Sequence, residues 1–565
     1  MKQKKPPSIK ELLATCRRPF IFAALFSSII NLLLLASPIY SLQIYDRVLS
    51  SGSIETLGML SIIVLGSFIF YASFQLIRSF IFLQISSWTD RKLTLHYVLG
   101  IIRLNALQAN QVFTQPIRDV GTIKSFINGQ TIQHLFDAPW AIIFLVALYF
   151  LHPLIGIMVT LSALTLLLLA FINDWQTKAA IVTANEIQMS NINQLNYMVK
   201  NAIAIESMGM ARVLSHRWQV KNNASIDAQN HSSKRTVIMG QLTKTIRMAI
   251  QVMIMGVSAY LVLNNKMTSG GIIAASILSG KALLPFDQAI STWKSVVSTS
   301  QAYQRLVKLE SEIPIRDDAM TLPAPAGKLS VESLSFTFLN QSKPFLKGIS
   351  FEIDEGDIIG LIGPSASGKS TLSKLLVGIW KPTQGVVRLD HANIYDWNRV
   401  DIGQYVGYLS QEIELFNGTI QENIARMDPD ADSNQVINAA KITGCHEMIL
   451  SLPQGYDTVL LNGGEPLSLG QRQRIGLARA FFGHPRLVVL DEPNAHLDQV
   501  GEKALLNVLN YAKQTNITVI IVSHRTSITA QLDKIMVLNQ GMIQQYGPKD
   551  EVLKQVLPAV SGNKS

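Results

Sequence analysis

A glycine-rich segment in the second half of the chain has the residues needed to hold a nucleoside triphosphate. Residues 363–370, Gly-Pro-Ser-Ala-Ser-Gly-Lys-Ser, fit the pattern G-x-x-x-x-G-K-[ST] without exception. They follow the apolar run 358–362 and precede residues 371–377, which can start a helix. In that context backbone N–H groups face the phosphates, Lys369 reaches the β- and γ-phosphates, and Ser370 can hold magnesium. A chance match in a Gly/Ser-rich turn is the alternative.

Two adjacent carboxylates end a second apolar run, Leu-Val-Val-Leu-Asp-Glu at 487–492. Asp491 would bind magnesium through water, and Glu492 would polarise the attacking water as a general base. Because buried strands often end in acidic residues, this pair taken alone is equally compatible with a structural role.

The elements that must position these residues are short apolar runs that alternate with helical stretches after about residue 310. The runs cover residues 358–362, 487–490 and 518–522. Continuous Val/Ile/Leu runs are typical of fully buried parallel strands. Alternation of strands and helices therefore predicts an α/β domain with a largely parallel sheet. Before it, residues 321–327, Thr-Leu-Pro-Ala-Pro-Ala-Gly, predict a linker, since proline and glycine break regular structure.

The first half of the chain consists of long uncharged runs. Charged residues make up 16% of the 565 residues, against a typical share of about 25%. The run 138–172 is longer than a bilayer core of about 30 Å requires, and Pro153 favours a break within it. The sequence thus predicts six membrane-spanning helices, with a tight turn at His152-Pro153. The runs cover residues 19–42, 56–77, 138–172, 248–263 and 269–290.

The net charge of +10 is unevenly distributed along these runs. Lysine and arginine gather in residues 1–18, 78–130 and 178–247, and the alternate loops carry few. The positive-inside rule then predicts that both termini are cytoplasmic, and this distribution argues against nucleic-acid binding. The two long basic stretches have helical apolar spacing and should extend the spans into the cytosol. The two cysteines, Cys16 and Cys445, lie too far apart in sequence to indicate a disulfide framework or a metal site.

Charges in the last run leave two explanations open. Lys281 and Asp287 lie within residues 269–290, and Asp287 shares a helix face with Lys294, seven residues on. Either this end of the helix stands in the cytosol, or Asp287 faces a cavity and contacts the transported molecule.

Residues 467–474, Leu-Ser-Leu-Gly-Gln-Arg-Gln-Arg, resemble the signature sequence of ATP-binding-cassette proteins, at that family's usual place before the acidic strand. The resemblance implies that Phe338 stacks on adenine and that Gln411 senses magnesium and contacts the membrane domain. It also implies that Asp498 belongs to the D-loop and that His524 contacts the γ-phosphate.

The resemblance further implies a homodimer with two identical composite sites, because in the family Ser468 and Gly470 close on ATP held by the partner's Lys369. The implied catalytic residues are Glu492, His524 and Gln411. The implied magnesium ligands are Ser370, Gln411 and Asp491. The implied nucleotide contacts are Phe338, Gly363, Pro364, Ser365, Ala366, Ser367, Gly368, Lys369, Ser370, Thr371, Ser468, Gly470, Gln471 and Asp498. Two departures from the family pattern are Leu469, where glycine is commonest, and Asn462, where exporters often carry glutamate.

The membrane half resembles the type I secretion ATPases that export RTX proteases and lipases. The similar segments are 31–52, 136–140 with His152-Pro153, 201–210 and 274–290. The implied fold combines an all-α six-helix transmembrane domain with an α/β P-loop ATP-binding-cassette domain. The implied boundaries are a cytoplasmic segment at 1–18, the transmembrane domain at 19–310, a linker at 311–327 and the nucleotide-binding domain at 328–565.

The resemblance implies an ATP-driven pump in the bacterial inner membrane for unfolded proteins that bear a C-terminal signal. It implies ATP and Mg²⁺ as cofactors, lipid contacts, and a periplasmic adaptor and an outer-membrane channel as partners. The segment before the first span is short and holds no cysteine–histidine peptidase domain, so we expect no processing of leader peptides. The alternative is an exporter of lipid or small amphiphilic molecules, which would share the motor and the six spans.

Overall fold

The computed structural model describes residues 8–107, 115–313, 322–338, 341, 343–495, 497–523 and 526–561. His524 and residues 314–321 of the predicted linker lie outside this part of the chain. The described residues up to 313 form one compact unit, called the membrane unit below, and those from 322 onward form a second, the motor unit.

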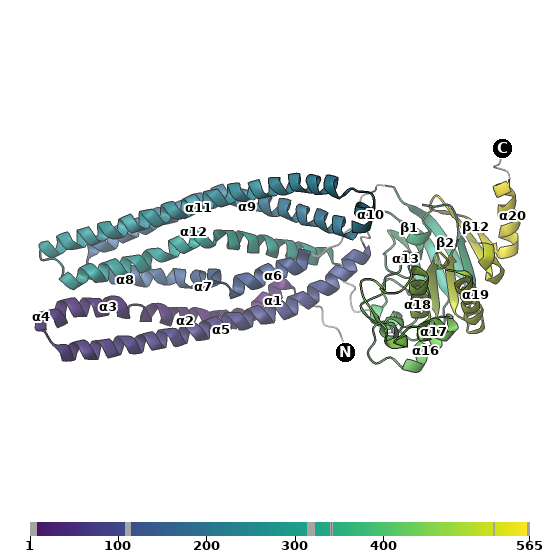
Figure 1. Ribbon diagram of the computed structural model, residues 1–565, viewed down its shortest axis with the longest axis horizontal. Coiled ribbons are helices and arrows are strands. Elements are labelled where there is room, and N and C mark those ends of the chain that lie inside the picture. Colours follow the sequence, from purple (N-terminus) through teal and green to yellow (C-terminus); the bar gives the residue numbers. More distant parts are fainter. Residues whose placement is uncertain are drawn as a thin grey trace. The chain divides into compact units, whose positions relative to one another are not determined.

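The membrane unit is built from α-helices, and within the described residues six helical spans are long and apolar enough to cross a membrane (Figure 1). This confirms the six predicted spans. In chain order the helices are α1 (Ile9–Thr15), α2 (Arg17–Leu33), α3 (Ala36–Gln43), the π-helix η1 (Ile44–Val48), α4 (Leu49–Ser51), α5 (Ile54–Leu107), α6 (Gln115–Asn128), α7 (Gln130–Asp137), η2 (Ala138–Trp140), α8 (Ala141–Leu151), α9 (Pro153–Lys200), α10 (Ala202–Ser207), α11 (Ala211–Leu263) and α12 (Ser269–Glu312).

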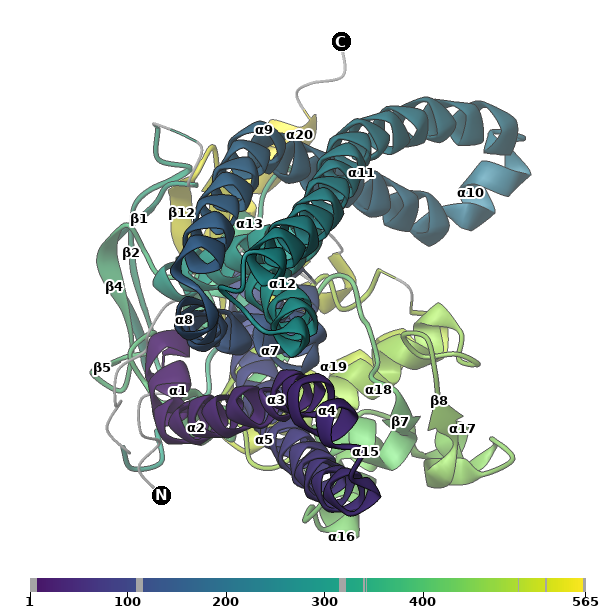
Figure 2. The same cartoon turned by 90° about the vertical axis from the view of Figure 1, so that its left-hand side faces the viewer.

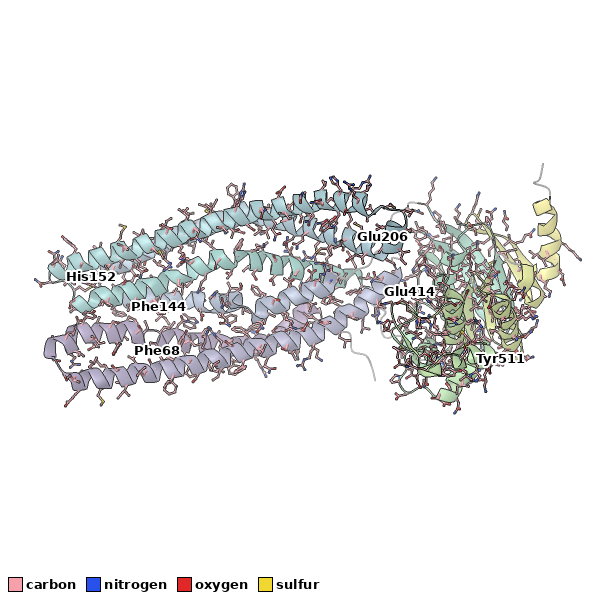
Figure 3. All side chains as sticks on the ribbon, in the orientation of Figure 1. Phe68, Phe144, His152, Glu206, Glu414 and Tyr511 are labelled. Carbon is pink, nitrogen blue, oxygen red and sulfur yellow. The ribbon has the colours of Figure 1, made fainter. Side chains whose placement is uncertain are left out.

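Four of these helices are much longer than a bilayer requires. Helices α5, α9, α11 and α12 have 54, 48, 53 and 44 residues, whereas about 20 residues cross a hydrocarbon core. The two basic stretches therefore do continue the spans as helices, as predicted. Along the spans, large apolar side chains are exposed as well as buried: Phe68 of α5 is 41% exposed, while Phe144 of α8 is 3% exposed (both labelled in Figure 3). An apolar outer surface of this extent is suited to lipid.

The predicted break at Pro153 is confirmed. Helix α8 ends at Leu151, and α9 begins at Pro153. Proline is well tolerated at the first position of a helix. His152 between them is extended, and its Nδ1 accepts a hydrogen bond from the Leu154 N–H at 3.2 Å. The short helix α10, which carries Glu206, joins α9 to α11 at the opposite end of the unit from His152 (Figures 2 and 3).

Buried charged groups tie helices of the membrane unit together. The guanidinium of Arg78 on α5 donates to the Ser27 hydroxyl of α2 at 2.7 Å and to the Asp137 carboxylate of α7. Arg78 therefore links α5 to both α2 and α7, two helices that are far from it in sequence.

Asp287 has a partner that its own helix does not provide. Arg247 of α11 donates to the Asp287 carboxylate of α12, so the pair joins two neighbouring spans. The other carboxylate oxygen, Oδ1, is buried and has no hydrogen-bond partner among the described residues. Lys294, the residue that helical spacing places on the same face, is exposed.

The motor unit contains two principal sheets. An antiparallel sheet has the order β2 (Leu346–Ile353), β1 (Leu329–Phe336), β4 (Gln384–Leu389), β5 (Ala392–Asn393). A six-stranded sheet has the order β12 (Met542–Pro548), β11 (Lys534–Asn539), β3 (Ile358–Ile362), β10 (Thr518–Val522), β9 (Leu487–Asp491), β6 (Val406–Leu409). The short strands β7 (Gly418–Thr419) and β8 (Val459–Leu460) pair separately. The helices are α13 (Lys369–Leu376), α14 (Arg399–Ile402), α15 (Ile420–Ile424), α16 (Ser433–Ile442), α17 (His446–Leu450), η3 (Gly455–Asp457), α18 (Leu469–Phe481), α19 (Gln499–Gln514), η4 (Thr526–Gln531) and α20 (Lys549–Ser561).

The order of the larger sheet brings four strand ends to one edge. Strands β3, β10, β9 and β6 are neighbours and run parallel, which confirms the predicted parallel sheet. Val522 pairs with both Leu361 and Asp491, and Leu490 pairs with Leu409. The residues that follow these four strands therefore meet, and in open α/β sheets ligands bind at this carboxyl edge.

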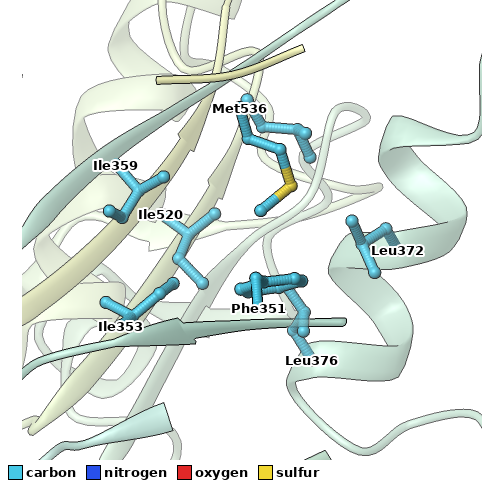
Figure 4. A pocket seen from close by; sticks show the side chains of 8 residues that line it. Phe351, Ile353, Ile359, Leu372, Leu376, Ile520 and Met536 are labelled. Atoms are coloured by element: carbon cyan, nitrogen blue, oxygen red, sulfur yellow. The ribbon is translucent and has the colours of Figure 1, made fainter. Parts of the chain in front are cut away.

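An apolar core holds the helix behind the glycine-rich segment in place. The small pocket in Figure 4 lies among side chains of both sheets and α13, and all of them are buried. Because its lining is wholly apolar, we interpret it as core packing rather than a ligand site. The lining residues are Phe351, Ile353, Ile359, Leu361, Leu372, Leu376, Ile520 and Met536.

Candidate nucleotide site

The glycine-rich segment forms a tight loop between β3 and α13. Gly363 has φ +154°, and a Cβ there would lie 2.1 Å from the Leu538 carbonyl oxygen. Gly368, with φ +107°, is the N-cap of α13, and a Cβ there would lie 2.6 Å from the Leu346 side chain. Both positions thus need glycine, and the loop delivers the N-terminus of α13 to the carboxyl edge of the sheet. A helix N-terminus approached in this way is suited to phosphate.

Lys369 lies buried within this loop. Its Nζ donates to the carbonyl oxygens of Gly363 and Pro364, both at 2.9 Å. Burial lowers the pKa of Lys369, and the nearby Glu492 and Asp491 carboxylates oppose that shift. The loop therefore holds a positive charge beside the two carboxylates.

Asp491, at the end of β9, fits a divalent cation. Burial raises the pKa of this carboxyl group, and a hydrogen bond with the Ser370 side chain opposes the rise. Its Oδ1 is buried and has no hydrogen-bond partner in the part of the chain that the structure describes. Because Mg²⁺ prefers oxygen ligands and an unpartnered buried oxygen is costly, the Ser370–Asp491 pair suits this ion.

Glu492 and Gln411 lie against each other. The Gln411 Nε2 is 3.4 Å from the Glu492 Oε2, so the strand ends of β6 and β9 bring together two residues 81 positions apart. Glu492 has φ +52°, and its N–H donates to the Val522 carbonyl at 3.0 Å. A non-glycine residue in this left-handed region is strained, and such strain is often found at active sites.

Phe338 belongs to an aromatic cluster that the sequence motifs did not predict. Its ring centroid lies 5.2 Å from those of Phe336 and Phe345 and 5.9 Å from that of Trp380. The side chain is half-buried, which leaves part of the ring available for stacking. Only the two-residue spacing of Phe336 and Phe338, which places both side chains on one face of a strand, could have indicated part of this cluster.

The signature segment begins a helix. Ser468 is the N-cap of α18, and it forms a reciprocal capping box with Gln471, at 3.3 and 2.9 Å. Gly470 lies in the first turn, and Leu469 is 57% exposed, so the larger side chain is accommodated without a clash. Asn462, the other departure, has φ +47°, which asparagine tolerates better than most residues.

Two predicted site residues stand apart from this group. Asp498 caps α19 by accepting from the Gly501 N–H at 2.8 Å. Among the described residues, no hydrogen bond or ion pair joins Ser468 or Asp498 to Lys369, Asp491 or Glu492. His524 lies outside the described residues.

Sequence reasoning missed two residues that hold the turn after Glu492. The buried amide of Gln473, on α18, donates to the Pro493 carbonyl oxygen. The Ser523 hydroxyl donates to Asn494 Oδ1 at 3.4 Å. Gln473 lies inside the signature segment, but nothing in its spacing indicated this contact.

Comparison with known proteins adds four findings. The family model described as ABC transporter matches residues 346–495. The type I secretion system ATP-binding protein PrsD of Rhizobium meliloti is 37% identical over 96% of this chain and 94% of its own length. The cyclolysin secretion/processing ATP-binding protein CyaB of Bordetella pertussis is 27% identical over 94% of this chain and 75% of its own. A solved bacterial Atm1-family ABC exporter with ATP bound aligns with TM-score 0.85 over 98% of this chain and 99% of that one, at 20% identity, and so shows the fold alone.

Proposed function

We propose that this chain, which belongs to the family of type I secretion ATP-binding proteins, exports unfolded proteins with a C-terminal signal from the cytoplasm at the expense of ATP. One observation carries this proposal above the others: the 37% identity extends over 96% of the chain and therefore includes the membrane unit. A lipid exporter would share the motor, but similarity of the membrane half supports protein export.

The motor residues have separate roles in the proposed reaction. The loop amides and Lys369 would bind the phosphates, and Ser370 and Asp491 would hold Mg²⁺, with Gln411 nearby. The bound ion would neutralise charge on the phosphate oxygens. Glu492 would accept a proton from the attacking water, and the contact with Gln411 would help to orient its carboxylate. Phe338 would stack on adenine, and His524 would contact the γ-phosphate.

We further propose a homodimer with two identical composite sites. Ser468 and Gly470 start α18, whose first-turn N–H groups are suited to an anion. Among the described residues, no hydrogen bond joins the Ser468 side chain to the phosphate loop of its own chain. In the proposed dimer, Ser468, Gly470, Gln471 and Asp498 meet ATP bound at the partner subunit's Lys369.

The membrane arrangement is proposed from the charge distribution. With the basic stretches in the cytoplasm, both termini are cytoplasmic and the His152 turn faces the periplasm. The proposed partners there are an adaptor protein and, through it, an outer-membrane channel. The proposed boundaries remain 1–18, 19–310, 311–327 and 328–565.

Deleting the gene and comparing the proteins of the culture medium tests the export function. We expect at least one protein to disappear from the medium and to return when the parent chain, but not Glu492→Gln, is supplied. An unchanged protein profile together with altered membrane lipid would favour the lipid exporter.

The role of Glu492 is tested in the purified full-length protein. Glu492→Gln should lower the rate of ATP hydrolysis by about 10²–10⁴-fold, because the general base is lost. ATP binding should persist, because the phosphate loop is intact. Glu447→Gln, an exposed change on α17, is the matched control and should keep the parent rate. A Glu492→Gln protein as fast as the parent would show that Glu492 is not the base.

A further inference from the structure

The side chain of Gln473 lies at a junction between the signature helix and the catalytic strand. It is 3% exposed. Its Nε2 donates to the Pro493 carbonyl oxygen, and the Glu492 carbonyl oxygen lies 3.4 Å away. These contacts connect residues 20 and 19 positions apart, so they are tertiary contacts rather than features of α18.

The backbone that Gln473 holds is the backbone that carries the proposed base. Glu492 has φ +52°, a conformation that only surrounding contacts can maintain. The Val522 carbonyl accepts from the Glu492 N–H on one side of the residue. On the other side, the Gln473 Nε2 donates to the Glu492 carbonyl, which belongs to the Glu492–Pro493 peptide, at 3.4 Å and to the Pro493 carbonyl of the next peptide. The Ala495 N–H also donates to the Glu492 carbonyl, at 3.2 Å. Rotation of the Glu492–Pro493 peptide would swing the carboxylate away from Gln411.

We propose that Gln473 is a positioning residue for ATP hydrolysis, which fixes the Glu492–Pro493 and Pro493–Asn494 peptides and thereby the direction of the Glu492 carboxylate. The inference rests on the proposed role of Glu492 as general base. It also gives α18 a second role. In the proposed dimer this helix presents Ser468 to the partner's nucleotide, and through Gln473 it positions the Glu492 carboxylate of its own chain. A shift of α18 on dimer closure would then move Glu492 directly.

An alternative explanation is that a buried amide has simply found backbone acceptors. That role predicts a loss of stability alone. A positioning role predicts a loss of turnover that depends on the presence of Glu492, because a base displaced by about 1 Å can lose up to about 100-fold in rate.

The test uses the full-length protein in detergent or nanodiscs. Gln473→Met keeps the length of the side chain and removes the amide. We expect kcat to fall about tenfold, while KM for ATP and the affinity for a fluorescent ATP analogue change by less than about twofold. Gln473→Asn keeps an amide but withdraws it by one methylene group, and it should show the same pattern. It also carries the test if Gln473→Met does not fold.

A double-mutant comparison separates positioning from stability. In a Glu492→Gln background, Gln473→Met should leave the residual rate unchanged, because the group that it positions is already absent. Asn423→Leu is the matched control: this buried amide of α15 also donates to two backbone carbonyls, those of Phe416 at 2.9 Å and Thr419 at 3.0 Å. It should lower the unfolding temperature and keep the parent kcat.

Three results would overturn the inference. Gln473→Met could hydrolyse ATP at the parent rate, or it could slow Glu492→Gln by the same factor as it slows the parent. Asn423→Leu could reproduce the loss of kcat. A fully active Glu492→Gln protein would instead refute the proposed base, so the two failures are distinguishable.

Discussion

Charged side chains are buried in both units, but they are held in different ways. In the membrane unit, Arg78 donates to acceptors on two other helices, Ser27 and Asp137. In the motor unit, Lys369 donates to carbonyl groups of its own loop, and one oxygen of Asp491 has no partner among the described residues.

We interpret this difference as one between charges that maintain the fold and charges that, in the proposed function, are available for a ligand. Removing one member of a buried ion pair leaves the other uncompensated, which is strongly destabilising. Removing a charge that faces a ligand site should lower activity strongly and stability only slightly. Such a charge is already desolvated in the folded protein, so its loss removes little folding free energy. Asp287 of the membrane unit has features of both groups, because one of its oxygens is paired with Arg247 and the other, Oδ1, is buried without a partner among the described residues.

The largest effect should follow from Lys369→Ala in the motor unit. We expect ATP hydrolysis to fall by at least about 10²-fold, because a positive group aimed at the phosphates is lost. The free energy of unfolding without nucleotide should change by less than about 1 kcal/mol, since relief of desolvation offsets the two lost hydrogen bonds. The measurements are ATPase rate, binding of a fluorescent ATP analogue, and thermal unfolding. Lys381→Ala, an exposed change in the same unit, is the control, and a large loss of stability in Lys369→Ala alone would contradict the comparison.

Arg78→Met should have the opposite signature. It leaves the Asp137 carboxylate without its ion-pair partner and should destabilise the protein by about 3–5 kcal/mol. Molecules that remain folded should bind ATP normally, because the motor residues are unchanged. Thermal unfolding in detergent measures the first effect, and nucleotide binding measures the second. The double variant Arg78→Met/Asp137→Leu should recover much of the loss, and failure to recover would mean that the pair is not the source of the destabilisation.

The meeting of Lys369, Asp491, Glu492 and Gln411 could be predicted from the sequence, because each of these residues lies at or after the end of a strand. The run 358–362 leads into the loop, and the run 487–490 leads into Asp491 and Glu492. Strand order then places these ends together with Gln411. What spacing could not predict were tertiary contacts such as that between Gln473 and Pro493, because one partner is a backbone carbonyl and carries no signal in the sequence.

The membrane unit shows the converse. Apolar runs predicted the spans, and Pro153 predicted the tight turn. The contacts between spans were not predictable. They connect residues of different helices, and the periodicity of apolar residues within one helix does not indicate which residue of another helix it meets. The Asp46 carboxylate accepts from the Gly270 N–H at 2.8 Å across 224 residues, and Arg247 reaches Asp287 across 40.

Substitution of Asp287 has the smallest expected effect, and it tests the comparison most directly. If its pair with Arg247 maintains the fold, Asp287→Asn should lower the free energy of unfolding by about 1–3 kcal/mol. Export per folded molecule, followed as proteins that reach the culture medium, should stay at the parent level. Lys294→Ala, an exposed change two turns along α12, is the control and should alter neither property.

The reverse outcome for Asp287→Asn would place this residue with the motor charges. Export would then fall while thermal stability stayed within about 0.5 kcal/mol, the usual range for a surface change. That result would mean that the buried, unpartnered Oδ1 faces the transported chain, and the explanation that this end of the helix merely stands in the cytosol would be wrong. We expect the structural outcome, because the Arg247 contact already joins Asp287 to a neighbouring span.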